Sequence, residues 1–120
     1  MGRHPRYVAD LTEAIAEQRP DVVLCSLFAC GAMIGAESAG IAFVVLIPNA
    51  YPLPAEGAPP FGMGLQPARG PLGRLRDLAI YRVNQRLWDK RALPRINALR
   101  VKLGLAPLHH ATDQIHHAYL

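Results

Sequence analysis

Four histidines near the C-terminus are the first candidates for chemistry in this sequence. They form the pattern HH-x5-HH, with members His109, His110, His116 and His117. Neutral imidazoles bind zinc well, but a zinc site needs ligands that converge on one point and are supported by further polar groups. Asp113 is the one acidic residue among these histidines, and no cysteine lies near them. We therefore expect an exposed polar tail and no metal site, and the role of the histidines stays open.

Ser26 is a second candidate, because it lies near the end of a predicted strand. Open α/β sheets place functional groups at the carboxyl ends of their strands. Ser26 is flanked by Cys25 and Leu27, however, so the G-x-S-x-G pattern of a hydrolase nucleophile is absent. The sequence also assigns no histidine as its base. We therefore name no catalytic residue in this chain.

Gly31 and Gly35 follow the same strand and open a predicted helix, where a phosphate-binding loop would lie. The segment has neither G-x-G-x-x-G nor the lysine-serine ending of a P-loop. Close packing of the helix on the sheet explains these glycines. Cys25 and Cys30 have neither zinc nor thioredoxin-type spacing, and a free cysteine in an apolar run packs as a small hydrophobe. We expect reduced cysteines and a cytoplasmic protein.

The elements that carry these residues are predicted from composition and periodicity. The chain has 120 residues, of which 51% are hydrophobic and 18% charged, which suits one folded domain that buries about two-thirds of its unfolded surface. Residues 7–18 predict an amphipathic helix. Residues 21–27 and 41–47 predict strands buried on both faces, and residues 31–39 predict a helix between them that ends at Gly40.

These elements form a β-α-β core over residues 7–48, for which parallel strand pairing is strongly favoured. The predicted fold class is α/β, with a partial Rossmann-like parallel sheet followed by a long loop and C-terminal helices. Residues 49–71 form the loop, and together with Pro48 they hold seven of the eleven prolines. Such a long, apolar loop either lines a pocket for an apolar ligand or closes over the core.

Residues 72–104 predict a basic helical segment, and residues 105–120 an exposed tail. We expect one helix over residues 72–90 and a second over residues 94–103, which begins at Pro94 and is capped by Gly104. Ten of the thirteen basic residues lie within residues 69–102, where only two residues are acidic; they are Arg69, Arg74, Arg76, Arg82, Arg86, Lys90, Arg91, Arg95, Arg100 and Lys102. This basic surface is either solvated or weakly attracted to an anionic membrane. No nucleic-acid-binding module is recognisable, so no nucleic acid is expected.

A membrane-spanning segment is not expected, although residues 22–55 carry only Glu37 as a charge. The first half of this run is too short to cross a bilayer. The second half contains prolines, including Pro48, which would break a spanning helix. The N-terminus lacks the apolar core of a signal peptide.

Three segments carry a family resemblance: PDVVLCSLFACGAMIGAESAGIAFVVLI, NAYPLPAEGAPPFGMGLQPARGPLGRLRD and LPRINALRVKLGLAPL. They resemble the glycosyltransferase superfamily that includes UDP-glucosyltransferases and bacterial macrolide glycosyltransferases. The resemblance covers roughly residues 7–118 and the second half of the family's N-terminal, acceptor-binding domain. It implies the GT-B fold, in which two Rossmann-like domains face each other across a cleft. Sugar transfer inverts the anomeric centre, and a histidine serves as the general base.

The resemblance further implies that parts of the active site lie outside these residues. The family's histidine would precede Met1, and the nucleotide-sugar domain would follow Leu120. The acidic partner of the histidine is replaced here by Ser26. We therefore expect a fragment that contributes to acceptor binding, is inactive alone, binds no cofactor itself, and is completed by a donor domain or a partner chain.

The expected function is transfer of a hexose from a UDP-type sugar to a small apolar acceptor. The candidate acceptor-binding residues come from the strand ends and the loop; they are Ser26, Leu27, Phe28, Asn49, Tyr51, Phe61 and Met63. The alternative is a small non-catalytic α/β protein whose basic helix binds an anionic membrane surface or nucleic acid. A third reading is a truncated reading frame with no stable fold.

Overall fold

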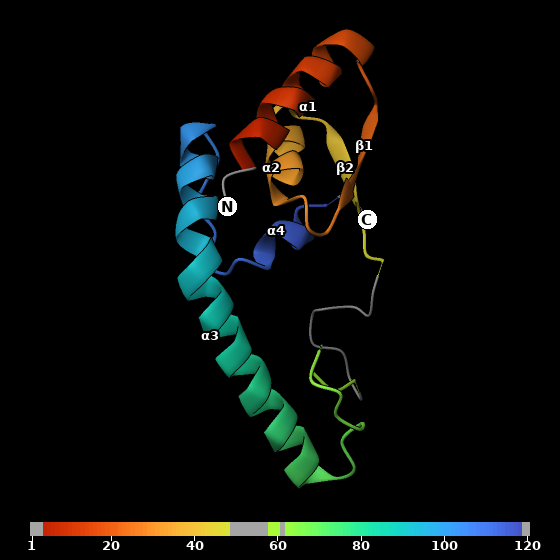
Figure 1. The fold of residues 1–120 in the computed structure, drawn as a ribbon, viewed down its shortest axis with the longest axis vertical. Coiled ribbons are helices and arrows are strands. Elements are labelled where there is room, and N and C mark those ends of the chain that lie inside the picture. Colours follow the sequence, from red (N-terminus) through yellow and green to blue (C-terminus); the bar gives the residue numbers. More distant parts are fainter. Residues whose placement is uncertain (1–3, 49–57, 61, 119–120) are drawn as a thin grey trace.

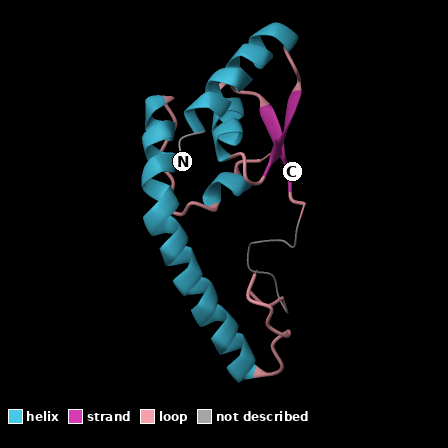
Figure 2. Cartoon of the chain, in the orientation of Figure 1, coloured by secondary structure: helices cyan, strands magenta, loops and turns pink. Residues whose placement is uncertain are grey.

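The computed structural model describes residues 4–48, 58–60 and 62–118 (Figure 1). A small α/β body holds the N-terminal elements, and one long helix extends past it (Figure 2). The elements are α1 (His4–Gln18), β1 (Val22–Ser26), α2 (Cys30–Ser38), β2 (Ala42–Leu46), α3 (Pro71–Lys102) and α4 (Asp113–His116). The predicted α/β class and the order helix, strand, helix, strand are confirmed. The sheet of the described residues has two strands.

The two strands pair in parallel, as predicted, with Val22 opposite Ala42 and Ser26 opposite Leu46. Side chains alternate between the two faces of a strand. On the inner face, Cys25 and Phe43 form the core with Met33 and Ala36 of α2. Leu11 of α1 packs against the same cluster. Helix α2 therefore covers one face of the sheet, and α1 packs mainly against α2.

The opposite face of the sheet is open, which corrects the prediction that both strands are buried on both faces. Val22 is 53% exposed, Leu24 66% and Leu46 54%. The continuous apolar sequence of each strand suits two covered faces. Since α2 lies against the inner face and α1 packs on α2, the described residues cover one face of the sheet where the sequence is suited to two covered faces.

The helices α1 and α2 approach closely at Gly35. A Cβ atom at this position would lie 3.2 Å from Leu11 Cδ2 and 3.8 Å from the Val8 Cα. The sequence predicts that this glycine serves packing of the helix on the sheet. The structure assigns it instead to packing between two helices.

Two glycines end their helices in the way the sequence predicts. Gly40 follows α2 with φ +69°, and Gly104 follows α3 with φ +76°. The Ile41 N–H then donates to the Ala36 carbonyl at 3.0 Å, and the Leu105 N–H donates in the same way to the carbonyl five residues before it, at 2.9 Å. This is the Schellman arrangement, which requires a left-handed residue that glycine adopts without a Cβ penalty.

The basic segment forms one helix, not the two that were predicted. Helix α3 runs continuously through Pro94. A proline inside a helix removes one backbone hydrogen bond, here the bond to the Lys90 carbonyl. The residues beyond Pro94 are held by tertiary contacts of Asn97 and Arg100, which keep the last turns helical.

The segment after α3, predicted as an exposed polar tail, is anchored to that helix by hydrogen bonds. The Asn97 side chain brackets Leu108, donating to its carbonyl at 3.0 Å and accepting from its N–H at 2.8 Å. The Asp89 carboxylate accepts from the Ala111 N–H at 2.8 Å. Leu108 is 9% exposed. The four histidines of the segment are exposed, as predicted, but the backbone that carries them is docked.

The chain leaves more surface in water than a domain of its mass normally does. Its accessible area is 8588 Å² for 13.1 kDa. An unfolded chain of that mass exposes about 19,000 Å², so folding buries about 55%, against the expected two-thirds. In the part of the chain that the structure describes, most of the exposed large apolar side chains lie on the open sheet face and along α3. Within the described residues, no helix combines the length and apolarity that crossing a bilayer requires.

Candidate functional site

The carboxyl end of β1 brings together three of the predicted acceptor-binding residues. The Leu27 N–H donates to the Leu46 carbonyl at 3.1 Å, which extends the pairing of the strands by one residue. The chain then turns, and the Ala29 N–H donates to the Ser26 carbonyl at 2.9 Å. The Ser26 Oγ accepts from the Phe28 N–H at 3.4 Å. The turn leads into α2, so these side chains lie at the edge where parallel sheets bind ligands.

This edge exposes apolar surface. Phe28 is 66% exposed, Leu27 is half-buried, and Ser26 is exposed. An exposed phenyl ring beside a hydroxyl group suits a small apolar ligand that carries one polar group. The hydroxyl of Ser26 has no basic partner among the described residues, so the edge can bind but carries no activated nucleophile.

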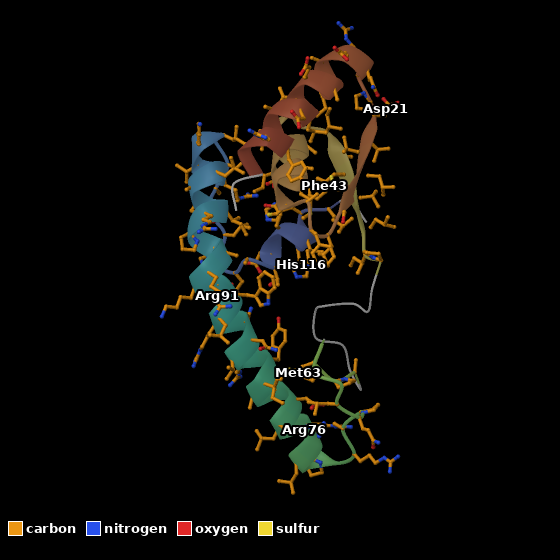
Figure 3. All side chains as sticks on the ribbon, in the orientation of Figure 1. Asp21, Phe43, Met63, Arg76, Arg91 and His116 are labelled. Atoms are coloured by element: carbon orange, nitrogen blue, oxygen red, sulfur yellow. The ribbon has the colours of Figure 1, made fainter. Side chains whose placement is uncertain are left out.

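Of the remaining predicted site residues, the structure describes only Met63. Met63 is 49% exposed and lies apart from the end of β1 (Figure 3). Asn49, Tyr51 and Phe61 lie outside the described residues. The site as described therefore consists of residues 26–28.

The largest polar cluster was missed at the sequence level, and Arg100 is at its centre. This side chain is 1% exposed, although it was counted with the basic surface. Its Nη1 donates to Glu37 Oε2 and to Gln114 Oε1, both at 2.6 Å. Its Nη2 donates to Glu37 Oε1 at 3.0 Å, and its Nε donates to the Ala106 carbonyl at 2.7 Å. The prediction of Arg100 as a surface cation is wrong, because an arginine with this many partners is stable in the interior.

The same cluster joins three helices through Glu37. Gln114 Nε2 donates to Glu37 Oε2 at 2.8 Å, and His117 Nδ1 lies 3.0 Å from Glu37 Oε1. Burial raises the pKa of Glu37, but hydrogen bonds from Arg100 and Gln114, with the charges of Arg100 and His117, outweigh it and lower the pKa below its ordinary value. Both carboxylate oxygens are engaged, so Glu37 is an anchor for α2, α3 and α4 and is unsuited to act as a general base.

One feature of the sequence could have revealed this cluster. Glu37 is the only charged residue in residues 22–55. A lone carboxylate in an apolar run is rarely buried without a partner, so it calls for a cation from elsewhere in the chain. Which cation supplies it is decided by the tertiary fold, because Arg100 lies 63 residues away.

A second histidine–carboxylate pair lies on the anchored segment. His110 Nδ1 is 2.7 Å from Asp89 Oδ2, and the His110 N–H donates to Asp113 Oδ2 at 2.9 Å. The hydrogen bond to Asp89, together with the charges of Asp89 and Asp113, raises the pKa of His110. The ring is half exposed, and its contact with Asp89 links the segment to α3.

The cysteines are unsuited to redox or nucleophilic chemistry. Cys25 is part of the core, as predicted, and burial raises the pKa of its thiol. Burial raises the pKa of Cys30 to about 11, against the opposing charge of Arg100. A thiol with a raised pKa carries little thiolate at neutral pH. Among residues 4–48, 58–60 and 62–118, no group of three or more histidines, cysteines and carboxylates is arranged to hold a metal ion.

Comparison of the chain with protein-family models, with curated proteins and with solved structures found no match.

Proposed function

We propose that this chain is an acceptor-binding part of a glycosyltransferase, which transfers a hexose from a UDP-type sugar to a small apolar acceptor. In this proposal the β1–α2–β2 unit is part of a Rossmann-like acceptor domain. The proposal rests on the sequence resemblance and on one structural observation that supports it. Ser26, Leu27 and Phe28 expose apolar surface and one hydroxyl group at the carboxyl edge of a parallel sheet.

The proposal assigns binding to this chain and catalysis to a larger assembly. The two histidines that contact carboxylates, His110 and His117, are on the anchored C-terminal segment and are used to hold it. A general base must reach the hydroxyl from which it takes a proton. Among the described residues, the Ser26 hydroxyl makes no hydrogen bond to a basic side chain. The chain alone is therefore expected to bind an acceptor and to transfer no sugar.

The test is a titration of the isotope-labelled chain with 1-naphthol, a small apolar molecule with one hydroxyl group. Backbone amide signals of residues 26–28 should shift in a saturable manner. Phe28→Ala should raise the dissociation constant about tenfold, the change expected when part of a phenyl ring's apolar contact is lost. Leu72→Ala is the matched control, because Leu72 is also exposed, at 82%, but lies at the start of α3.

A second titration, with UDP-glucose, separates the two substrates. The proposal expects no shifts, because the nucleotide sugar belongs to a domain outside these residues. Binding of UDP-glucose at residues 26–28 would contradict this division. A loss of naphthol affinity as large in Leu72→Ala as in Phe28→Ala, or no saturable shift at residues 26–28, would contradict the proposed acceptor site.

A further inference from the structure

The first half of α3 presents one face that is exposed along its whole length. At about 100° per residue, nine positions between residues 72 and 90 fall within an arc of about 140°. We call this the outward face of α3. Its apolar members are Leu72, Leu75, Ala79, Val83 and Leu87, and its cationic members are Arg76, Arg82, Arg86 and Lys90. Each of the nine is exposed, and none is acidic.

The carboxylates of this half of α3 lie outside the arc and are already engaged. Asp77 is 2.8 Å from the Nη2 of Arg76, and Asp89 binds the anchored segment. Among the described residues, no carboxylate lies within ion-pair distance of Arg82, Arg86 or Lys90. The outward face therefore combines uncompensated positive charge with exposed leucine and valine side chains.

The position of this face in the fold makes it accessible to a partner with an extended surface. Figure 1 shows the first half of α3 extending past the body formed by α1, α2 and the sheet. The exposed fractions are 82% for Leu72, 64% for Leu75 and 56% for Val83. Exposed apolar side chains in a row are uncommon in a monomeric protein unless they meet a partner.

We propose that the outward face of α3 binds an anionic lipid bilayer, with the helix lying in the plane of the interface. Leucine and valine side chains enter the boundary between headgroups and acyl chains, and the arginines extend to lipid phosphates. The combination of cationic and apolar side chains on this face favours a lipid bilayer over other partners. Nucleic acid would use the cations and leave the leucines in water, and a second copy would bring cations against cations. The inference is independent of the proposed acceptor site.

The first test measures binding of the full chain to vesicles of phosphatidylcholine with phosphatidylglycerol. Trp88 is the single tryptophan and is 64% exposed, so energy transfer to a dansyl-labelled lipid reports binding. The variant Arg82→Gln/Arg86→Gln should bind roughly 25-fold more weakly, about fivefold for each cation near the surface. The control Arg91→Gln/Arg95→Gln removes the same charge from exposed positions outside the arc and should change binding less than about threefold on the same scale.

The second test separates apolar insertion from charge attraction. Val83→Ser should weaken vesicle binding by about fivefold, because the variant loses a valine side chain that would be about half buried in the lipid interface. Val22→Ser is the matched control, since Val22 is 53% exposed on the open sheet face and Val83 is 56% exposed. Circular dichroism at 222 nm checks that each variant is folded. Binding should also weaken as salt rises.

Three results would overturn the inference. One is equal binding to vesicles of pure phosphatidylcholine. Another is an equal loss in the two arginine pairs, since general attraction to net charge would then explain the binding. The third is tighter binding to a short DNA duplex than to the vesicles, with the loss again confined to Arg82 and Arg86, which would assign the face to nucleic acid.

Discussion

Removal of the buried Arg100 side chain should destabilise the fold more than any other arginine substitution in the chain. In Arg100→Met the guanidinium disappears with its bonds to Glu37, Gln114 and the Ala106 carbonyl. The Glu37 carboxylate then stays in a site where it is only 18% exposed. Breaking a buried pair by removing one partner costs about 3–5 kcal/mol. Because Glu37 keeps some contact with water, we expect a value near 3 kcal/mol, a large part of the 5–15 kcal/mol that typical domains possess.

Urea unfolding followed by circular dichroism at 222 nm measures this loss. The control Arg95→Met removes an exposed arginine from the same helix and should change the unfolding free energy by no more than about 0.5 kcal/mol. The double variant Glu37→Met/Arg100→Met should be more stable than the sum of the two single losses implies, by at least about 2 kcal/mol, since neither charge is then left unpaired.

Acid should weaken the same cluster. Burial raises the pKa of Glu37, but its bonds to Arg100 and Gln114 lower it below the ordinary value of 4.5. A carboxylate whose pKa is lowered in the folded state stabilises the fold above its unfolded pKa, and this contribution is lost as the pH falls through the folded pKa. The difference in unfolding free energy between the wild type and Glu37→Gln should therefore narrow below pH 4.5.

The urea experiments can contradict the buried-pair argument in two ways. One is a loss below about 1 kcal/mol in Arg100→Met, and the other is strict additivity of the two single losses in the double variant.

Three further predictions concern the anchored segment, the glycines that end α2 and α3, and the proline inside α3. Asp89→Asn should lower the pKa of His110 towards its ordinary value of 6.5, which NMR titration of the ring measures. The raised pKa stabilises the folded state below pH 6.5, and this contribution is lost as the pH rises through the folded-state pKa. The difference in unfolding free energy between wild type and variant should therefore close at alkaline pH. Gly40→Ala and Gly104→Ala should each lower the free energy of unfolding, measured in urea, by about 1–2 kcal/mol, because both positions have positive φ. A new Cβ would meet no atom within 4 Å at either position, so backbone conformation is the cause of the expected loss. An unchanged free energy of unfolding would contradict this explanation. Pro94→Ala should stabilise α3 by about 1–3 kcal/mol and raise the melting temperature, because it restores a backbone hydrogen bond; an unchanged melting temperature would count against this.

Three of the candidate acceptor-binding residues share a position at a strand end that the sequence predicted. Ser26, Leu27 and Phe28 are neighbours in the sequence, and the end of a strand can be recognised from the residues around it, so their common position is a local matter. Met63 was expected to join them, but it lies apart from the end of β1 (Figure 3). Its position depends on tertiary packing, which no periodicity in the sequence encodes.

The sequence by itself determined the features that depend on residues close together in the chain. The apolar stripe of α1, the β-branched runs of β1 and β2, and the glycines that end α2 and α3 were all recognisable, because local backbone and side-chain preferences govern them. The parallel pairing followed from the short helical crossover between the strands.

Only the tertiary structure decided which charges are buried and which apolar faces are covered. Arg100 has the same sequence context as its basic neighbours, yet it alone meets Glu37, which lies 63 residues earlier. Pro94 lies inside a continuous helix because the last turns of α3 are held by distant partners. The physical reason is the same in both cases. Burial and charge pairing are properties of the assembled surface, and residues far apart in the chain contribute to it together.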